Sequence, residues 1–402
     1  MSDKVGLVSE SSTNDCSYFP VKKSKYFLMT LLGFAVFILY TPPKVFNDTD
    51  NQQDFLYENK TINILFWTKY FGNYDWYAEE DGNAGIKTLN SVNCPVTNCF
   101  FTHNHSFLSN IADFDAIMIH GPEYLHNIPP HFSSKQMYIF VSLEAPTFIR
   151  EDLNRFNNYY NMTMTYRMDS DVEWDYGKIL KSDTKEVIAP SKNPNWKLSD
   201  DKFFDEEYLK IYQNKTRSIA WFVSNCDAFN KRQDLVKKMQ QLIDIDIYGK
   251  CGNLSCTANC DQLLTTTYKF YLSFENSLCQ EYVTEKFYRA LNQMTIPIIF
   301  NGAKDKKMYG PPKSFIDVNE FDTVENLVNY LKSLMNNPRE YLKYFWWKKH
   351  YSVKTHPVFP YIHCELCKKL NDKTFMSAKR QYESIQSWYI DNMCNQSAHI
   401  QF

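Results

Sequence analysis

The 402-residue sequence has no excess of charge of either sign, since 44 Lys and Arg residues face 46 Asp and Glu residues. It therefore offers no broad positive surface for a polyanion, and nucleic-acid binding is not expected. The sequence also lacks low-complexity tracts and repeats of solenoid period. With 44% hydrophobic and 16% aromatic residues, the chain can bury a large core, which we expect to be divided between two domains.

Long apolar runs are absent except for one near the start, Tyr26 to Tyr40, which reads YFLMTLLGFAVFILY. Three lysines between residues 22 and 25 precede it, so the positive-inside rule places the residues before Tyr26 in the cytosol and the bulk of the chain in the lumen. A helix of this length spans only about 22 Å of the roughly 30 Å hydrocarbon core, so bilayer thinning or flanking residues must help. A cleaved signal peptide and a buried core helix are the alternatives, but no small-x-small cleavage site follows Tyr40.

Sequons and cysteines are distributed unequally about this run. All seven N-x-Ser/Thr sequons follow it, at Asn47, Asn59, Asn104, Asn161, Asn214, Asn253 and Asn395. Ten of the eleven cysteines also follow it and only Cys16 precedes it, which fits an oxidised disulfide framework in the lumen. The pair Cys364-x-x-Cys367 and the group at 251, 256 and 260 also fit zinc or redox sites, although disulfides are the default in an oxidising lumen.

The remaining pattern predicts an α/β fold. Apolar strand candidates alternate with helical patterns at 233–243 and 324–335, which favours parallel sheets covered on both faces. The candidate strands are Ile62 to Tyr70, Ala116 to His120, Met137 to Leu143, Ile219 to Ser224, Ile245 to Tyr248, Tyr268 to Phe274 and Ile296 to Phe300. A polar, lysine-rich interval at 181–205 separates two doubly wound halves. The predicted parts are a cytosolic tail (1–25), a transmembrane anchor (26–40), a polar stem (41–60), two domains (61–205 and 206–360) and a cysteine-containing tail (361–402) that packs back on the first domain.

The stretch from Tyr268 to Phe300 is the most informative for chemistry. A buried strand ends in Glu275, Asn276 and Ser277, and a loop leads through Thr284 into a helix with Glu285 and Lys286 in its first turn. Ligands bind at the carboxyl ends of such strands, where helix N-termini offer free N–H groups to anions. The arrangement suits a nucleotide diphosphate, with a carboxylate free to accept sugar hydroxyls. The alternative is that Thr284 is only an N-cap and Glu285 only complements the helix dipole.

This stretch closely resembles the donor-binding motif of the α1,3-fucosyltransferases, glycosyltransferase family 10, with Phe274-Glu275-Asn276 followed by Tyr282-Val283-Thr284-Glu285-Lys286. The resemblance extends to residues 162–171, 176–177, 224–226 and 248–249, and it covers most of the chain after the stem. It implies a GT-B fold: two Rossmann-like domains facing a cleft, the first for the acceptor and the second for GDP-fucose. With the anchor, it predicts a single-pass type II protein of the Golgi membrane whose catalytic part is lumenal.

The resemblance also implies roles for single residues. Inverting transfer by single displacement needs one base, and the family's base matches Glu144, in Leu143-Glu144-Ala145-Pro146 after a predicted strand. Arg232 and Lys286 match the cations that offset the charge developing on the departing GDP. Without the resemblance, Arg232 reads as a solvated residue at a helix start. Six further positions match donor-binding residues, the last three less securely: Asn276, Tyr282, Glu285, Tyr176, Ser224 and Asn225.

A metal-dependent transferase is the alternative reading of Asp169-Ser170-Asp171, a DxD triplet of the kind that holds a nucleotide-bound divalent cation. Three other DxD triplets occur in the sequence, so this signal is weak. Neutralisation of the diphosphate by Arg232 and Lys286 makes a metal unnecessary. We therefore expect no metal site and no required cofactor, although Mn²⁺ or another divalent cation stimulates many members of the family.

The cysteines separate branches of the family. Cys251, Cys256, Cys260 and Cys279 resemble the plant and invertebrate branch, whose members modify the GlcNAc of the N-glycan core. The expected reaction is transfer of L-fucose from GDP-β-L-fucose to O3 of a GlcNAc in the chitobiose core. A Lewis-type enzyme acting on antennal N-acetyllactosamine and a catalytically silent glycan-binding relative are the alternatives. The resemblance also pairs Cys94 and Cys99 with Cys364 and Cys367.

Overall fold

The computed structural model describes residues 60–76, 78, 84–123, 128–256, 259–355, 358–378, 380–395 and 400. The predicted cytosolic tail and anchor, nearly all of the stem, and the sequons at Asn47 and Asn59 lie outside these residues. Within the described ranges, no helix is long and apolar enough to cross a membrane. Every described element falls in one compact unit, Tyr57–Phe402.

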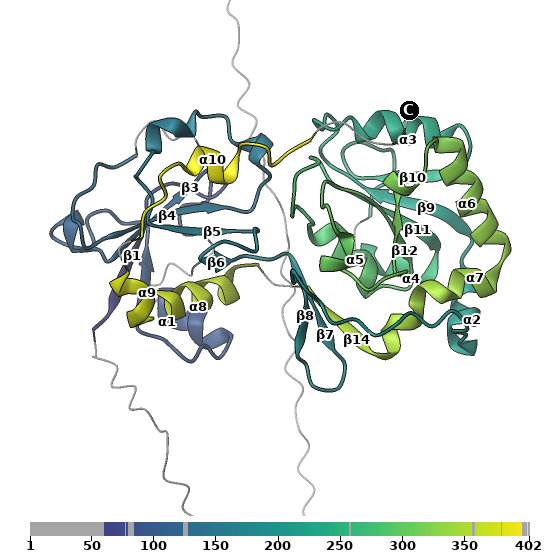
Figure 1. Ribbon diagram of the computed structural model, residues 1–402, viewed down its shortest axis with the longest axis horizontal. Coiled ribbons are helices and arrows are strands. Elements are labelled where there is room, and N and C mark those ends of the chain that lie inside the picture. Colours follow the sequence, from purple (N-terminus) through teal and green to yellow (C-terminus); the bar gives the residue numbers. More distant parts are fainter. Residues whose placement is uncertain are drawn as a thin grey trace, which may run out of the picture. The chain divides into compact units, whose positions relative to one another are not determined.

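The first half of this unit is built on a six-stranded parallel sheet (Figure 1). The strand order is β2 (Cys99–Thr102), β1 (Ile62–Phe66), β3 (Ala116–His120), β4 (Met137–Ser142), β5 (Met162–Thr165) and β6 (Val172–Glu173). The two central strands are buried over almost their whole length, as their uninterrupted apolar sequences predict. Helix α1 (Ala84–Ser91) packs against α8 (Val358–Leu370), which comes from the other end of the chain.

The second half is built on a five-stranded parallel sheet (Figure 1). Its order is β10 (Ile245–Tyr248), β9 (Arg217–Phe222), β11 (Tyr268–Phe274), β12 (Ile296–Phe300) and β13 (Ile316–Asp317). Both faces are covered, because alternate residues of β9 join different apolar clusters. Ile219 and Trp221 pack with α3 (Arg232–Gln240) and α6 (Val324–Asn336), whereas Ala220 packs with residues of α4 (Cys260–Thr266) and α5 (Glu285–Asn292). Two parallel sheets covered by helices therefore confirm the α/β part of the predicted fold class.

A third sheet was not predicted. It is antiparallel, with the order β14 (Tyr351–Thr355), β7 (Gly177–Lys181) and β8 (Val187–Ala189). Thus strands from the expected end of the first domain pair with a strand from the expected end of the second. The remaining elements are α2 (Glu206–Asn214), α7 (Pro338–Leu342), α9 (Lys373–Ser377), α10 (Ile385–Tyr389) and the 3-10 helices η1 (Ile111–Asp113), η3 (Pro146–Phe148), η4 (Leu153–Phe156), η5 (Lys306–Met308), η6 (Val318–Glu320) and η7 (Lys343–Lys349).

All seven predicted strands are present, and three of them need correction at their ends. The first ends at Phe66 instead of Tyr70, because the chain turns at a bridge between Tyr70 and Asn73. The strands predicted to end at 143 and 224 end one and two residues earlier. The helix expected at 233–243 is Arg232–Gln240, and the helix expected at 324–335 is Val324–Asn336.

Ten cysteines form five disulfides: Cys94–Cys364, Cys99–Cys367, Cys226–Cys251, Cys256–Cys260 and Cys279–Cys394. The first two join α8 to the first half; the resemblance implies that Cys94 and Cys99 bond Cys364 and Cys367, and the structure gives the order of the pairs. Cys364 and Cys367 are three residues apart on α8, so they lie on one face of the helix. The described residues contain no group of three or more His, Cys, Asp or Glu side chains that could hold a metal ion.

Candidate active site

Glu144 lies in the loop that follows β4, at the carboxyl end of the first sheet. The next turn begins at Pro146, which opens η3 and fixes the direction of the chain. The carbonyl oxygen of Glu144 accepts hydrogen bonds from the hydroxyls of Tyr389 at 2.5 Å and Ser142 at 3.2 Å. One residue earlier, the carbonyl of Leu143 accepts a hydrogen bond from the Tyr176 hydroxyl. The backbone that carries the carboxylate is therefore held from several sides.

The carboxylate of Glu144 has one hydrogen bond among the described residues. Its Oε2 accepts from the hydroxyl of Tyr282 at 3.2 Å, and Tyr282 comes from the second half. Burial raises the pKa of Glu144, and nearby Lys286 only partly opposes this increase. A carboxylate with a raised pKa and a free oxygen is suited to accept a proton.

Glu275 is the first residue after β11, at the carboxyl end of the second sheet, and is 0% exposed. Its carboxylate accepts hydrogen bonds from the backbone N–H and the hydroxyl of Thr284, each at 2.8 Å, and from Lys286 Nζ at 3.2 Å. Burial raises its pKa, whereas Lys286 opposes that rise. The hydroxyl of Thr284 therefore bonds Glu275 and does not cap its own helix, although Thr284 does occupy the N-cap position of α5.

Lys286 lies in the first turn of α5 and is surrounded by oxygen atoms. Its Nζ donates to Thr284 Oγ1 at 2.7 Å, to Glu285 Oε1 at 3.1 Å and to Glu275. Burial disfavours its charged form, but Glu275 and Glu285 outweigh this and raise the pKa of Lys286. For Glu285, burial is outweighed by Lys286, which holds the pKa of that carboxylate below its ordinary value. The side chain of Lys286 is 19% exposed, so a positive charge is fixed at the helix start and still accessible.

Arg232 is buried, with 2% of its surface exposed, so its interpretation as a solvated residue is wrong. Its guanidinium donates to the carbonyls of Phe274 at 2.5 Å and Asn225 at 3.0 Å. It also lies over the ring of Trp221, 5.5 Å from the ring centroid. Its Nε is buried without a hydrogen-bond partner in the described part of the chain, which leaves one donor for a further group.

The other predicted donor-binding residues differ in burial and in their contacts with Glu275, Lys286 and Arg232. Asn276 follows Glu275 and has a buried Oδ1 without a hydrogen-bond partner in the described residues, whereas Ser224 is exposed after β9. No sequence pattern pointed to Asn230, which donates to the Glu275 carbonyl at 2.8 Å, or to Thr147, whose hydroxyl lies 2.6 Å from that of Ser277. Thr147 and Ser277 connect the segment after Glu144 with the β11–α5 loop (275–284).

The two aspartates of the DxD triplet are engaged by protein groups. Asp169 forms two hydrogen bonds with the guanidinium of Arg167, at 2.8 and 2.7 Å. Asp171 accepts from Arg380 at 2.7 Å and from Tyr382 at 2.9 Å. Asp171 thus anchors the C-terminal segment to the first half, whereas Asp169 pairs with an arginine of the first half itself.

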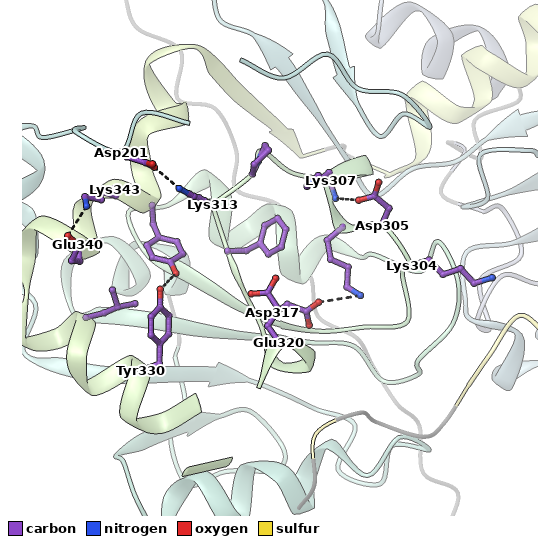
Figure 2. Close-up of a pocket in the computed structure, with 15 residues that line it drawn as sticks. Asp201, Lys304, Asp305, Lys307, Lys313, Asp317, Glu320, Tyr330, Glu340 and Lys343 are labelled. Carbon is purple, nitrogen blue, oxygen red and sulfur yellow. Dashed lines mark hydrogen bonds and ion pairs between the residues drawn. The ribbon is translucent and has the colours of Figure 1, made fainter. Parts of the chain in front are cut away.

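A pocket of about 800 Å³ lies elsewhere in the second half, beside β13 and α6 (Figure 2). None of the predicted catalytic or donor-binding residues lines it. Its charged groups are largely paired with one another, as Lys313 bonds Asp201 at 2.6 Å and Lys306 lies 3.3 Å from Asp317. The pocket therefore offers little uncompensated charge to a nucleotide, whereas the surroundings of Lys286 and Arg232 retain buried or partly buried donors.

Family models match both halves of the chain. The model described as "Fucosyltransferase, N-terminal" matches residues 59–177, and "Glycosyltransferase family 10 (fucosyltransferase) C-term" matches residues 212–388. The chain belongs to glycosyltransferase family 10, the fucosyltransferases.

Named relatives agree with this assignment. The chain is 37% identical to Alpha-(1,3)-fucosyltransferase C of Drosophila melanogaster over 93% of its own length and 89% of that protein. It is 32% identical to Glycoprotein 3-alpha-L-fucosyltransferase A of the same organism, over 80% and 59% of the two chains. It is 29% identical to 4-galactosyl-N-acetylglucosaminide 3-alpha-L-fucosyltransferase FUT5 of Homo sapiens, over 68% of this chain and 69% of that protein.

Proposed function

We propose that this enzyme transfers L-fucose from GDP-β-L-fucose to O3 of a GlcNAc, with inversion, and that the acceptor is the chitobiose core of an N-glycan. The observation that carries the proposal is the link between two strand ends. Glu144 follows β4, Lys286 and Glu275 lie after β11, and the Tyr282 hydroxyl joins the two places through its 3.2 Å bond to Glu144.

The chemistry needs one base and a stabilised leaving group. Glu144 removes the proton from O3 of the acceptor as that oxygen forms its bond to the anomeric carbon of fucose. The bond between this carbon and the phosphate oxygen breaks at the same time, and GDP leaves with the electron pair. Lys286 and Arg232 stabilise the charge that develops on the diphosphate, which favours the transition state over the ground state.

Other predicted residues then take supporting roles. Asn276, Tyr282 and Glu285 contact the donor sugar and ribose, and Tyr176, Ser224 and Asn225 complete the donor site. Two fixed cations meet the charge requirement, so no cofactor is required, while Mn²⁺ or another divalent cation acts at most as a stimulant. The engagement of Asp169 and Asp171 by arginines supports this assignment of charge neutralisation to the protein.

The choice of acceptor rests on relatives and cysteines. The Drosophila glycoprotein 3-alpha-L-fucosyltransferase is 32% identical and matches 80% of this chain. The human enzyme named for 4-galactosyl-N-acetylglucosaminide is 29% identical and matches 68%. The cysteines at 251, 256, 260 and 279, which resemble those of the core-modifying branch, all form disulfides in the second half or with the C-terminal segment. Transfer to antennal N-acetyllactosamine is the competing activity.

We also propose that the enzyme is anchored in the Golgi membrane by residues 26–40, with its catalytic part in the lumen. Ten disulfide-bonded cysteines and exposed sequons at Asn104, Asn214 and Asn253 support an oxidising, glycosylating compartment. Asn161 differs, because its amide donates to the Arg380 carbonyl at 3.1 Å and accepts from the Tyr138 N–H at 3.1 Å. Endoglycosidase treatment of the membrane-bound protein tests this topology.

An acceptor assay on the full-length enzyme tests the function. Detergent-solubilised protein is given GDP-fucose with a glycopeptide that carries the chitobiose core or with N-acetyllactosamine, and the product linkage is determined by NMR. We expect α1,3-linked fucose on the core GlcNAc and little on the disaccharide. The reverse preference would replace the core assignment with the Lewis-type one, and GDP binding without transfer to either acceptor would contradict the enzyme assignment.

A further inference from the structure

We propose that the C-terminal segment 380–395 positions the catalytic carboxylate and couples it to the β11–α5 loop, with Tyr389 as the positioning residue. The inference rests on the proposed role of Glu144 as the base. It assigns a task to a segment that contains none of the residues predicted to take part in the reaction.

The segment is firmly attached to the first half. The backbone N–H of Tyr382 donates to the Tyr160 carbonyl at 2.9 Å, and the Gln386 side chain accepts from the Leu153 N–H at 3.2 Å. The guanidinium of Arg167 lies 4.3 Å from the centroid of the Trp388 ring and also donates to the Trp388 carbonyl. These contacts place α10 beside the ends of β4 and β5.

Tyr389 is the point at which the segment reaches the base. Its side chain is 0% exposed and packs against Phe140 and Tyr166, with ring centroids 5.0 and 6.1 Å away. Its hydroxyl donates to the carbonyl oxygen of Glu144 at 2.5 Å. This bond fixes the peptide unit that follows the Glu144 Cα atom, and with it the direction in which the carboxylate leaves the backbone.

The other end of the segment is bonded to the β11–α5 loop. Cys394 forms a disulfide with Cys279, the Gln280 N–H donates to the Met393 carbonyl at 2.7 Å, and the Asn395 N–H donates to the Leu278 carbonyl at 2.9 Å. The same loop carries Tyr282, whose hydroxyl bonds the Glu144 carboxylate.

The backbone and the carboxylate of Glu144 are thus held by two tyrosines, and a disulfide joins the segments from which these tyrosines come. A displacement of the β11–α5 loop is therefore transmitted to the base through both residues. This arrangement keeps the proton acceptor aligned with the loop that contacts the donor, and alignment of reacting groups accounts for large factors in rate.

The first test is Tyr389→Phe in the full-length enzyme, which keeps the ring and removes the hydroxyl. Tyr341→Phe is the matched control, because that buried hydroxyl also donates to a backbone carbonyl, that of Lys269 at 2.6 Å, away from the site. We expect Tyr389→Phe to lower kcat by about tenfold or more with KM for GDP-fucose unchanged, and Tyr341→Phe to change kcat less than twofold. Equal effects of the two variants on kcat and on thermal stability would show a purely structural role and overturn the proposal.

The second test removes the covalent link with Cys279→Ser/Cys394→Ser, and Cys256→Ser/Cys260→Ser removes another disulfide of the second half as control. We expect only the first double variant to raise KM for GDP-fucose and lower kcat together. If kcat and KM of Cys279→Ser/Cys394→Ser are unchanged, the proposed coupling between the C-terminal segment and the β11–α5 loop is wrong. Glu144→Gln distinguishes failure of this inference from failure of the proposed function. If Glu144→Gln keeps near-normal turnover, Glu144 is not the base. If Glu144→Gln loses turnover while Tyr389→Phe is unaffected, only the positioning role of Tyr389 is rejected.

Discussion

Two glutamates occupy equivalent places in the two halves of the molecule. Glu144 follows β4 of the first sheet and Glu275 follows β11 of the second, and burial raises the pKa of both. Their surroundings differ. Glu275 is enclosed by Thr284 and Lys286, whereas Glu144 has a single phenol, that of Tyr282, as a hydrogen-bond donor to its carboxylate in the described residues.

In the proposed mechanism, this difference in hydrogen-bond partners separates a supporting carboxylate, Glu275, from a reactive one, Glu144. Glu275 uses its hydrogen-bonding capacity to place Lys286 and the start of α5, so little of that capacity remains for a substrate. Glu144 is held mainly through its backbone and keeps carboxylate lone pairs for a proton. Burial of a carboxylate thus identifies a candidate base only when its partners are counted as well.

The largest expected effect is on turnover. Glu144→Gln keeps the shape of the side chain but cannot accept the proton, so kcat should fall by ~10²–10⁴-fold, as is typical for the loss of a general base. Binding of GDP should be nearly unchanged, because in the proposed mechanism Glu144 acts on the acceptor. Initial rates together with calorimetry of GDP binding measure both quantities. Near-normal turnover would refute the assignment of the base.

The same substitution at Glu275 should act mainly on stability. Glu275→Gln leaves Lys286 beside a neutral amide, and removal of one partner of a buried ion pair costs about 3 kcal/mol. Urea unfolding under non-reducing conditions should show this loss, while Glu144→Gln should lose about 1 kcal/mol or less. Equal losses in the two variants would remove the distinction between a supporting and a reactive carboxylate.

Lys286→Ala tests whether the cation that Glu275 holds acts on the donor. Hydrogen bonds to charged groups contribute ~1.5–3 kcal/mol, so GDP affinity should fall about 10- to 100-fold, and turnover should fall with it. Lys313→Ala is the control, because that exposed lysine pairs with Asp201 at the separate pocket. Unchanged GDP affinity in Lys286→Ala would move the phosphate site elsewhere.

The smallest expected effect concerns pH. The base must be ionised, so kcat should rise with pH through the pKa of Glu144, which burial places above its ordinary value of 4.5. The hydrogen bond from Tyr282 lowers that pKa, so Tyr282→Phe should move the acidic limb of the kcat profile to higher pH. Tyr389→Phe leaves the carboxylate bonds intact and should not move the limb. A shift toward lower pH in Tyr282→Phe would contradict the geometry.

The fold was predictable where strands are long and apolar. β3, β4, β11 and β12 have continuous apolar sequences, and each was identified. β5 was not, because Met162–Thr165 alternates apolar and polar residues, yet Thr163 and Thr165 are buried with their hydroxyls bonded. The pairing of β14 with β7 was missed because it joins positions about 170 residues apart, and no local pattern reports such a contact. The pairing of β7 with β8 is local, but most of it falls in the polar interval that was interpreted as a domain boundary.

The candidate site was predictable only in part. Lys286 and Glu285 were identified from the local pattern of a strand end followed by a helix start. Glu144 and Arg232 were identified only through the resemblance to the family. The burial of Arg232 was missed because the carbonyls that bind it, those of Phe274 and Asn225, belong to other elements. Tyr389 gave no signal either, since it lies 245 residues from the carbonyl that it bonds.

The pairing of α8 with the first half sets an order of events during synthesis. Cys94 and Cys99 find their partners 270 and 268 residues later, after every strand of the second half has been made. At about 5–20 residues per second, the ribosome needs roughly 15 to 50 seconds to cover that interval. Throughout this interval neither Cys94 nor Cys99 can form its native disulfide, because Cys364 and Cys367 have not yet been made. The half that is translated first is therefore the half that is completed last.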